Sequence, residues 1–236
     1  MTEPAAPPAT SSIWEDFIDV FISPAELFRR RRDGRFGHAI LVLVVVTAVI
    51  FFGTRGAMEP IFDAEFQRSM ASRPGMTPEQ LEAARNMGRT LAPLTVLIGL
   101  PIAALLLGAM VWLGARSVGG RISYPQGAAI ATFSMFPRLV EAVTNAVQAL
   151  LMDQGKLISL HRLKLGVSRF LDPDQTSALT LALLGRLDLY TLWVTLLIAI
   201  GIKQMTALPG SRVAAAAVLI WLIGAFPALL QGFGSA

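Results

Sequence analysis

The feature that most constrains this chain is a set of long apolar stretches without charged side chains. Residues 36–54, 90–115 and 213–236 form three such stretches, of 19, 26 and 24 residues. An α-helix rises about 1.5 Å per residue, so about 20 apolar residues cross the roughly 30 Å hydrocarbon layer of a bilayer. We therefore predict a membrane-spanning helix in each stretch.

Two further apolar stretches, residues 126–152 and 181–203, contain polar side chains away from their ends. These are Arg138, Glu141, Asn145, Arg186 and Asp188. Ionisable groups in hydrocarbon are costly, so they usually face a protein interior and have a partner there. On consecutive antiparallel spans the two acids and two bases would lie at similar depth, and we expect ion pairs across the two helices.

This intramembrane polar cluster has three candidate roles. It is a structural lock that fixes helix register, a relay for protons or ions, or a polar site for a lipid headgroup or a partner helix. The number of spans also stays open, because only 14 uncharged residues separate Asp188 from Lys203. If that segment does not span, the C-terminus returns to the side of the N-terminus.

The composition supports a membrane protein. Of the 236 residues, 54% are hydrophobic and 15% are charged, whereas a soluble domain is nearer a quarter charged. The mean hydropathy is +0.59. Because the apolar residues are grouped in runs, we predict an all-α polytopic membrane protein, a five-helix transmembrane bundle with N-terminal amphipathic helices. The spans cover residues 37–55, 90–115, 126–152, 181–203 and 213–233, within a transmembrane domain of residues 37–236.

The region before the first span has two parts. Residues 1–12 are rich in Pro, Ala, Ser and Thr, which is typical of a disordered tail. Residues 13–36 form a cytoplasmic amphipathic and basic segment, which begins with a helix too short to span. Its apolar face holds Ile13, Trp14, Phe17, Ile18 and Phe21, and its other face, which we expect to be solvated, holds Glu15, Asp16 and Asp19.

A basic cluster follows this helix, and its members are Arg29, Arg30, Arg31, Arg32 and Arg35. In one reading the segment lies on the cytoplasmic leaflet, with Trp14, Phe17 and Phe21 in lipid and the arginines on anionic headgroups. In the other, the arginines only hold the N-terminus in the cytoplasm and the aromatic side chains pack against the bundle.

Basic residues also predict the orientation. With five spans, three basic groups lie on one side: Arg29–Arg35, Arg116 with Arg121, and Lys203 with Arg212. The positive-inside rule makes this side cytoplasmic, so the N-terminus is inside and the C-terminus is external. The basic loop between Lys156 and Arg169 is an exception, because this arrangement places it outside.

The chain carries no signature of catalysis. It lacks serine-elbow, HExxH, paired metal-ligand and phosphate-loop motifs, and the absence of cysteine excludes disulfides, zinc–thiolate sites and thiol catalysis. His38 and His161 lie far apart in sequence. The formal charge is +4, but the arginines flank apolar runs, which indicates membrane orientation rather than nucleic-acid binding. We predict no catalytic residue, metal site or cofactor.

Several short motifs are distributed along most of the chain. They are Trp14-x-x-Phe17, Phe21-x-x-Pro24-x-x-x-Phe28, Leu113-Gly-Ala-Arg116 with Gly119-Gly120, Phe136-Pro137, Leu187-Asp188-Leu-Tyr190-x-x-Trp193, and Ile200-Gly201. In this order they resemble the bacterial branch of the Yip family, the Rab/Ypt-interacting membrane proteins. The resemblance implies five spans, a cytoplasmic N-terminus and a role in membrane organisation or partner recruitment. Eukaryotic relatives bind Rab GTPases, a function that does not transfer residue by residue.

We therefore predict a scaffold or adaptor of the bacterial inner membrane that contacts lipid, and protein partners through its cytoplasmic N-terminus. Small-residue faces on the second and fifth spans, including the Ala104–Gly108 pair, allow a homodimer. The alternative is a small transporter or ion- or proton-conducting protein that uses Arg138, Glu141 and Asp188. The chain has no internal repeat of the kind that secondary transporters use.

Overall fold

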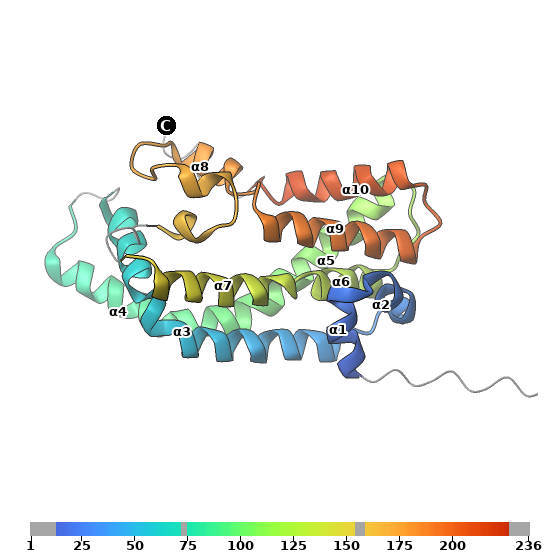
Figure 1. Cartoon of the computed structure of the whole chain (residues 1–236), viewed down its shortest axis with the longest axis horizontal. Helices are drawn as coiled ribbons and strands as arrows, with labels where there is room; N and C mark the ends of the chain where they lie inside the picture. Colours follow the sequence, from blue (N-terminus) through green and yellow to red (C-terminus); the bar gives the residue numbers. More distant parts are fainter. Residues whose placement is uncertain (1–12, 72–74, 154–158, 227–236) are drawn as a thin grey trace, which may run out of the picture.

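The structure is a computed structural model that describes residues 13–71, 75–153 and 159–226, and every regular element within these residues is helical. The predicted all-α fold is confirmed (Figure 1). The helices are α1 Ile13–Ile22, α2 Pro24–Arg30, α3 Gly37–Ala71, α4 Pro78–Leu94, α5 Leu100–Ser117, α6 Tyr124–Ser134, α7 Pro137–Leu151, α8 Ala178–Leu184, α9 Leu189–Met205 and α10 Gly210–Ile223. Short helical turns are η1 Arg31–Asp33, η2 Thr95–Gly99, η4 Leu160–Leu163 and η5 Val167–Phe170. The predicted tail, residues 1–12, and residues 227–233 of the last predicted span lie outside the described residues.

Two helices are long and apolar enough to cross a membrane. They are α3 and the helix Pro78–Ser117, which α4, η2 and α5 form without a break. Only 11% and 17% of their most apolar windows are buried, so most of these side chains face outward. A soluble protein rarely exposes so large an apolar surface, whereas a membrane protein presents it to lipid. Two shorter apolar helices, α9 and α10, accompany them.

The core lies where α5, α6, α9 and α10 meet. Helices α5 and α6 approach each other closely at Gly108, where an added Cβ would lie 2.7 Å from the Cα of Ala128. Ala104, one turn earlier, is fully buried. The predicted Ala104–Gly108 helix contact is therefore confirmed, and it is made inside the chain. Gly114 on α5 likewise packs on Ile220 of α10, so these faces are not free for a second copy.

Two predicted spans are interrupted. Residues 126–152 form α6 and α7 rather than one helix, because Pro137 has no N–H to continue the ladder and instead starts α7. Residues 181–203 are also not one helix: α8 ends at Leu184, and α9 begins after Asp188. In contrast, the helix of residues 78–117 is not divided: it contains the π-helical turn η2 just before Pro101 and continues through it.

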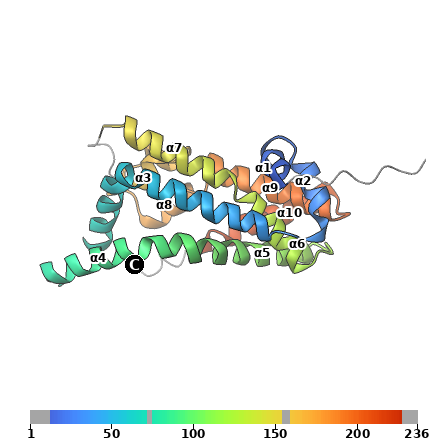
Figure 2. The same ribbon diagram turned by 90° about the horizontal axis from the view of Figure 1, so that it is seen from below.

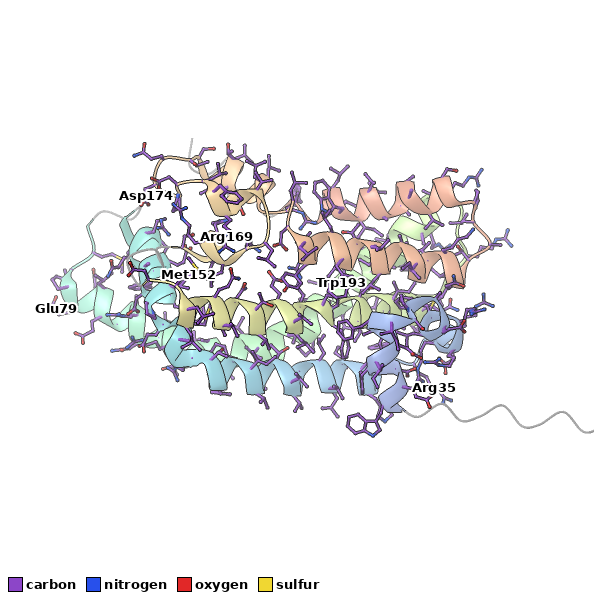
Figure 3. All side chains as sticks on the ribbon, viewed as in Figure 1. Arg35, Glu79, Met152, Arg169, Asp174 and Trp193 are labelled. Carbon is purple, nitrogen blue, oxygen red and sulfur yellow. The ribbon has the colours of Figure 1, made fainter. Side chains whose placement is uncertain are left out.

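The short helices α1 and α2 dock at one end of the elongated bundle, beside the turn between α9 and α10 (Figures 1 and 2). Arg32 donates to the backbone oxygen of Gln204, with 2.5 Å between Nη2 and O, and Gln126 donates to the oxygen of Arg32 at 2.7 Å. The three basic groups that flank the spans thus share this end. Figure 3 shows Arg35 here and Glu79 at the opposite end.

Candidate functional site: a polar lock and an N-terminal cap

Asp188 organises the start of α9, and its side chain is fully buried. Its Oδ1 accepts hydrogen bonds from the backbone N–H groups of Tyr190 and Thr191, both at 3.1 Å. Its Oδ2 accepts the N–H of Leu165 at 3.1 Å. The first N–H groups of a helix are unpaired and carry partial positive charge, so a buried carboxylate is stable there without a cation. Asp188 has no ion pair within the described part of the chain.

Residues 159–170, which we call the strap, cross the bundle at this point. The N–H of Leu189 donates to the oxygen of Leu165 at 3.1 Å, and Gly166 pairs with Asp188 in an isolated antiparallel bridge. A Cβ on Gly166 would collide with the Leu187 carbonyl, so this approach requires glycine. At its other end, Ser159 Oγ donates to Glu65 Oε1 of α3 at 2.8 Å. The strap therefore ties α3 to the start of α9.

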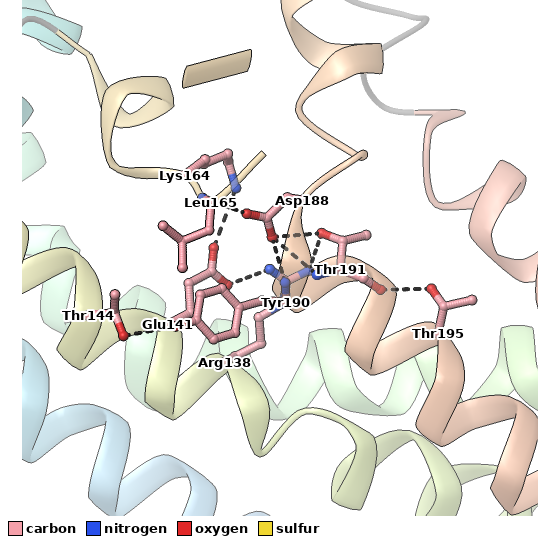
Figure 4. Close-up of polar contacts among 9 residues, drawn as sticks. All are labelled: Arg138, Glu141, Thr144, Lys164, Leu165, Asp188, Tyr190, Thr191 and Thr195. Atoms are coloured by element: carbon pink, nitrogen blue, oxygen red, sulfur yellow. Dashed lines mark hydrogen bonds and ion pairs between the residues drawn. The ribbon is translucent and has the colours of Figure 1, made fainter. Parts of the chain in front are cut away.

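Helix α7 completes the cluster (Figure 4). Arg138 Nη1 donates to Glu141 Oε2 at 2.5 Å, and its Nη2 donates to the Thr191 hydroxyl at 3.0 Å. Lys164 of the strap reaches Glu141 Oε1 at 3.5 Å. The formal charges of Arg138, Glu141, Lys164 and Asp188 cancel, and every carboxylate oxygen has a donor. We call these four residues, with Thr191, the polar lock, because they join α7, the strap and α9.

The predicted ion pairs between the charged residues of segments 126–152 and 181–203 are not found, so this prediction is wrong. Arg186 contacts no acid among the described residues: it donates to the oxygens of Gly224 at 3.0 Å and Trp221 at 2.7 Å, and lies over the Trp221 ring. These carbonyls end α10, where a cation is favourable. Asn145 lies one turn beyond Glu141, and its Oδ1 is buried without a partner among the described residues. The ion pairs that do form here were not predicted: Glu141 pairs with Arg138 within α7 and with Lys164 of the strap.

Sequence reasoning missed Lys164, Gly166 and Thr191. A signal was present, because Asp188 stands directly before a 14-residue uncharged run, which is the position of an N-cap. The strap is part of the basic loop that is an exception to the positive-inside rule; here Lys164 pairs with Glu141, and Arg169 donates to Gln148 Oε1 at 2.5 Å. Glu141 thus balances the charge of Lys164, whereas Gln148 is a neutral hydrogen-bond partner and leaves the charge of Arg169 in place. Lys156 lies outside the described residues.

One acidic residue of helix α1, Asp16, is buried rather than solvated, whereas Glu15 is exposed as expected. Asp16 is 1% exposed and accepts hydrogen bonds from Arg30 at 3.0 Å and from Arg31 Nε at 2.6 Å. Trp14 and Ile22, in contrast, are 72% and 71% exposed. The prediction that Asp16 is solvated is wrong, because its carboxylate is bound by Arg30, at the end of α2, and by Arg31 of the turn η1. We call residues 13–36 the cap.

The arginines of the basic cluster have partners within the chain. Arg30 also bonds Asp19 at 2.5 Å; burial disfavours its charged form, but the hydrogen bonds and charges of Asp19 and Asp16 outweigh this and raise the pKa of Arg30. The other contacts are Arg29 with Glu26, Arg32 with the Gln204 oxygen, and Arg35 with Asp33. This arrangement agrees with the reading in which the arginines do not serve primarily as headgroup ligands.

The aromatic residues of the cap divide into two groups. Phe17 stacks on Phe136 with ring centroids 5.2 Å apart, and Phe21 meets the Trp193 ring edge-on at 5.7 Å. These two pack against the bundle. Trp14 points outward with Ile18 and Ile22, so the cap presents an apolar outer surface.

Within the residues that the structure describes, no group of three or more His, Asp or Glu side chains is placed to hold a metal ion. The lock brings acids and bases together, but each is bonded to its neighbours. These bonds connect α7, the strap and the start of α9.

The comparisons with known proteins identify the family. No curated protein and no solved structure matches the chain. A family model described as the Yip1 domain matches residues 18–230, which include α2 to α10, the polar lock and most of the cap. The chain therefore belongs to the Yip1 domain family of membrane proteins.

Proposed function

We propose that this protein is a five-span scaffold or adaptor of the bacterial inner membrane, with a cytoplasmic N-terminus and an external C-terminus. Its outer surface is apolar along one 18-residue window of α3 and one of the helix Pro78–Ser117, which supports insertion in lipid. The basic loops gather at the end that carries the cap, which supports a cytoplasmic position for that end. Eukaryotic Yip proteins bind Rab GTPases, but we do not extend this partner class to the present chain.

The observation that carries the proposal is the outer surface of the cap. Trp14, Ile18 and Ile22 are exposed on a helix whose inner face is fixed by Asp16. Such a surface at the membrane boundary suits contact with lipid and with an apolar partner helix. We infer that the cap recruits protein partners at the cytoplasmic surface, without catalysis.

The polar lock favours a structural role over ion conduction. A relay needs titratable groups that exchange protons along a path. In the lock, Glu141 is held by Arg138 and Lys164, and Asp188 is held by backbone N–H groups. We propose that the lock fixes α7, α9 and the strap so that the bundle presents the cap rigidly.

The test is affinity purification of the full chain from bacterial membranes in mild detergent. The variant replaces Trp14, Ile18 and Ile22 with serine, which leaves the inner face of α1 intact. The matched control is Glu15→Ala, an exposed change on the same helix. We expect a reproducible set of proteins that co-purifies with the wild type and the control and is lost in the triple variant. Proton flux in proteoliposomes, without cap-dependent partners, would instead support the transporter.

A further inference from the structure

A pocket of about 540 Å³ lies between α3 and the helix that α4 and η2 form. Figure 2 shows the second half of α3 turning toward α4. Both walls are irregular here: Pro60 lies inside α3, and Pro93 and the π-helical turn η2 interrupt the other wall. π-Helical turns are frequent at functional sites. The polar lock contributes no residue to this pocket.

The pocket is charged at one end only. There, Arg85 pairs with Asp63 and Arg89 pairs with Glu59, the latter at 2.5 Å, so that ion pairs join the two walls. Arg55 also lines the pocket and has no ion pair or hydrogen bond within the described residues. Three arginines against two carboxylates leave one positive charge without a counter-charge.

The other end of the pocket is apolar, and its lining includes Phe51, Leu91 and Val96. Counted from Gly37 at about 1.5 Å per residue, Phe51 lies about 21 Å and Arg55 about 27 Å into the bilayer. The hydrocarbon layer is about 30 Å thick. The apolar end thus lies in hydrocarbon, and Arg55 lies at its boundary, on the side opposite the cap.

We propose that this pocket binds one anionic phospholipid from the leaflet opposite the cap. Arg55 binds the phosphate of the headgroup, and an acyl chain lies along Phe51, Leu91 and Val96. A zwitterionic lipid offers no net charge to match the surplus cation, so the anionic class is preferred. The site rests on the membrane placement proposed above but not on the recruitment of partners.

Gly88 allows a selective test. It lines the pocket, and a Cβ added there meets nothing within 4 Å, so we expect a side chain at this position to be tolerated and Gly88→Trp to fill the pocket. Gly56 is equally open and exposed but does not line the pocket, so Gly56→Trp is the matched control. Arg55→Gln removes the cation and leaves the apolar end intact.

The full chain in mild detergent is titrated with phosphatidylglycerol, with phosphatidylcholine of the same acyl chains and with inorganic phosphate, and bound lipid is counted by native mass spectrometry. We expect one phosphatidylglycerol per chain, lost in Gly88→Trp and retained in Gly56→Trp. Arg55→Gln should weaken it about fivefold, the effect of one basic side chain at an anionic surface. Equal binding of both lipids, binding that survives Gly88→Trp, or binding of phosphate alone would each overturn the proposal. Partner recruitment by the cap is unaffected by any of these outcomes.

Discussion

Two aspartates, Asp16 in the cap and Asp188 in the polar lock, are almost completely buried but stabilised differently. Asp16 is held by the guanidinium groups of Arg30 and Arg31. Asp188 is held by backbone N–H groups of α9 and the strap. The first arrangement depends on charge and can exchange with water. The second depends on the path of the backbone and exists only when the strap is in place.

The largest expected effect is that of Asp188→Ala. It leaves the N–H groups of Leu165, Tyr190 and Thr191 without their acceptor in a buried site, which should lower the free energy of unfolding by about 3 kcal/mol. SDS titration in mixed micelles measures this. Asp188→Asn is the graded control, because an amide oxygen still accepts from α9 while its NH2 group opposes the Leu165 N–H. A loss below about 1 kcal/mol for the alanine variant would contradict the role of the N-cap.

Asp16→Ala should cost less, about 1–2 kcal/mol, because the side chains of Arg30 and Arg31 are 31% and 19% exposed and can be rehydrated. The same titration measures it, and faster tryptic cleavage after Arg31 would report release of the cap. Added salt should weaken the ion pairs that dock residues 13–36 in the wild type. It should not weaken the hydrogen bonds from backbone N–H groups to Asp188 at the start of α9. Asp19→Ala, a change at a more exposed partner of Arg30, serves as the milder control. Unchanged trypsin resistance in Asp16→Ala would disprove the docking role of the pair.

A double-mutant cycle compares direct with indirect contacts inside the lock. Arg138 and Asp188 share only the Thr191 hydroxyl, so the coupling of their alanine variants should stay below about 0.5 kcal/mol. Arg138 and Glu141 are in direct contact, and their cycle should show a larger coupling. A strong coupling in the first cycle would restore the ion pair between α7 and α9 that the sequence alone suggests.

The smallest effect is a pH dependence at His161 in the strap. Burial lowers the pKa of His161, and nearby Lys164 and Arg68 add to this while Glu65 opposes it. As the pH falls, His161 is therefore protonated first in the unfolded chain, at its ordinary pKa of about 6.5, and only at lower pH in the folded chain. Stability should be complete above that pH and decline as the pH falls toward the lower pKa of the folded state. His161→Gln should remove this component, and an identical pH profile in the variant would exclude the histidine as its source.

The sequence predicts much of the fold because hydrocarbon selects strongly for uncharged runs. It does not predict which side of α1 faces inward. The pattern that places Trp14 and Asp16 on different faces does not say which of the two packs against the bundle. The direction is set by Arg30 and Arg31, whose approach depends on the turn at residues 31–34. Likewise, the sequence alone places Asp188 as a charge inside a span. In the structure the helix is broken after Leu184, so Asp188 is the N-cap of α9. Both errors arise where tertiary contacts decide the partner of a carboxylate.

The contact between Arg32 and Gln204 has a consequence for biosynthesis. The cap is the first described part of the chain to leave the ribosome, yet its binding surface includes α9, which is made more than 150 residues later. The cap therefore cannot settle until the insertion machinery has released nearly the whole polypeptide. The cap can dock only after α9 has been synthesised. In a product truncated before α9 the cap would stay undocked, with Asp16 and its arginines in contact with water.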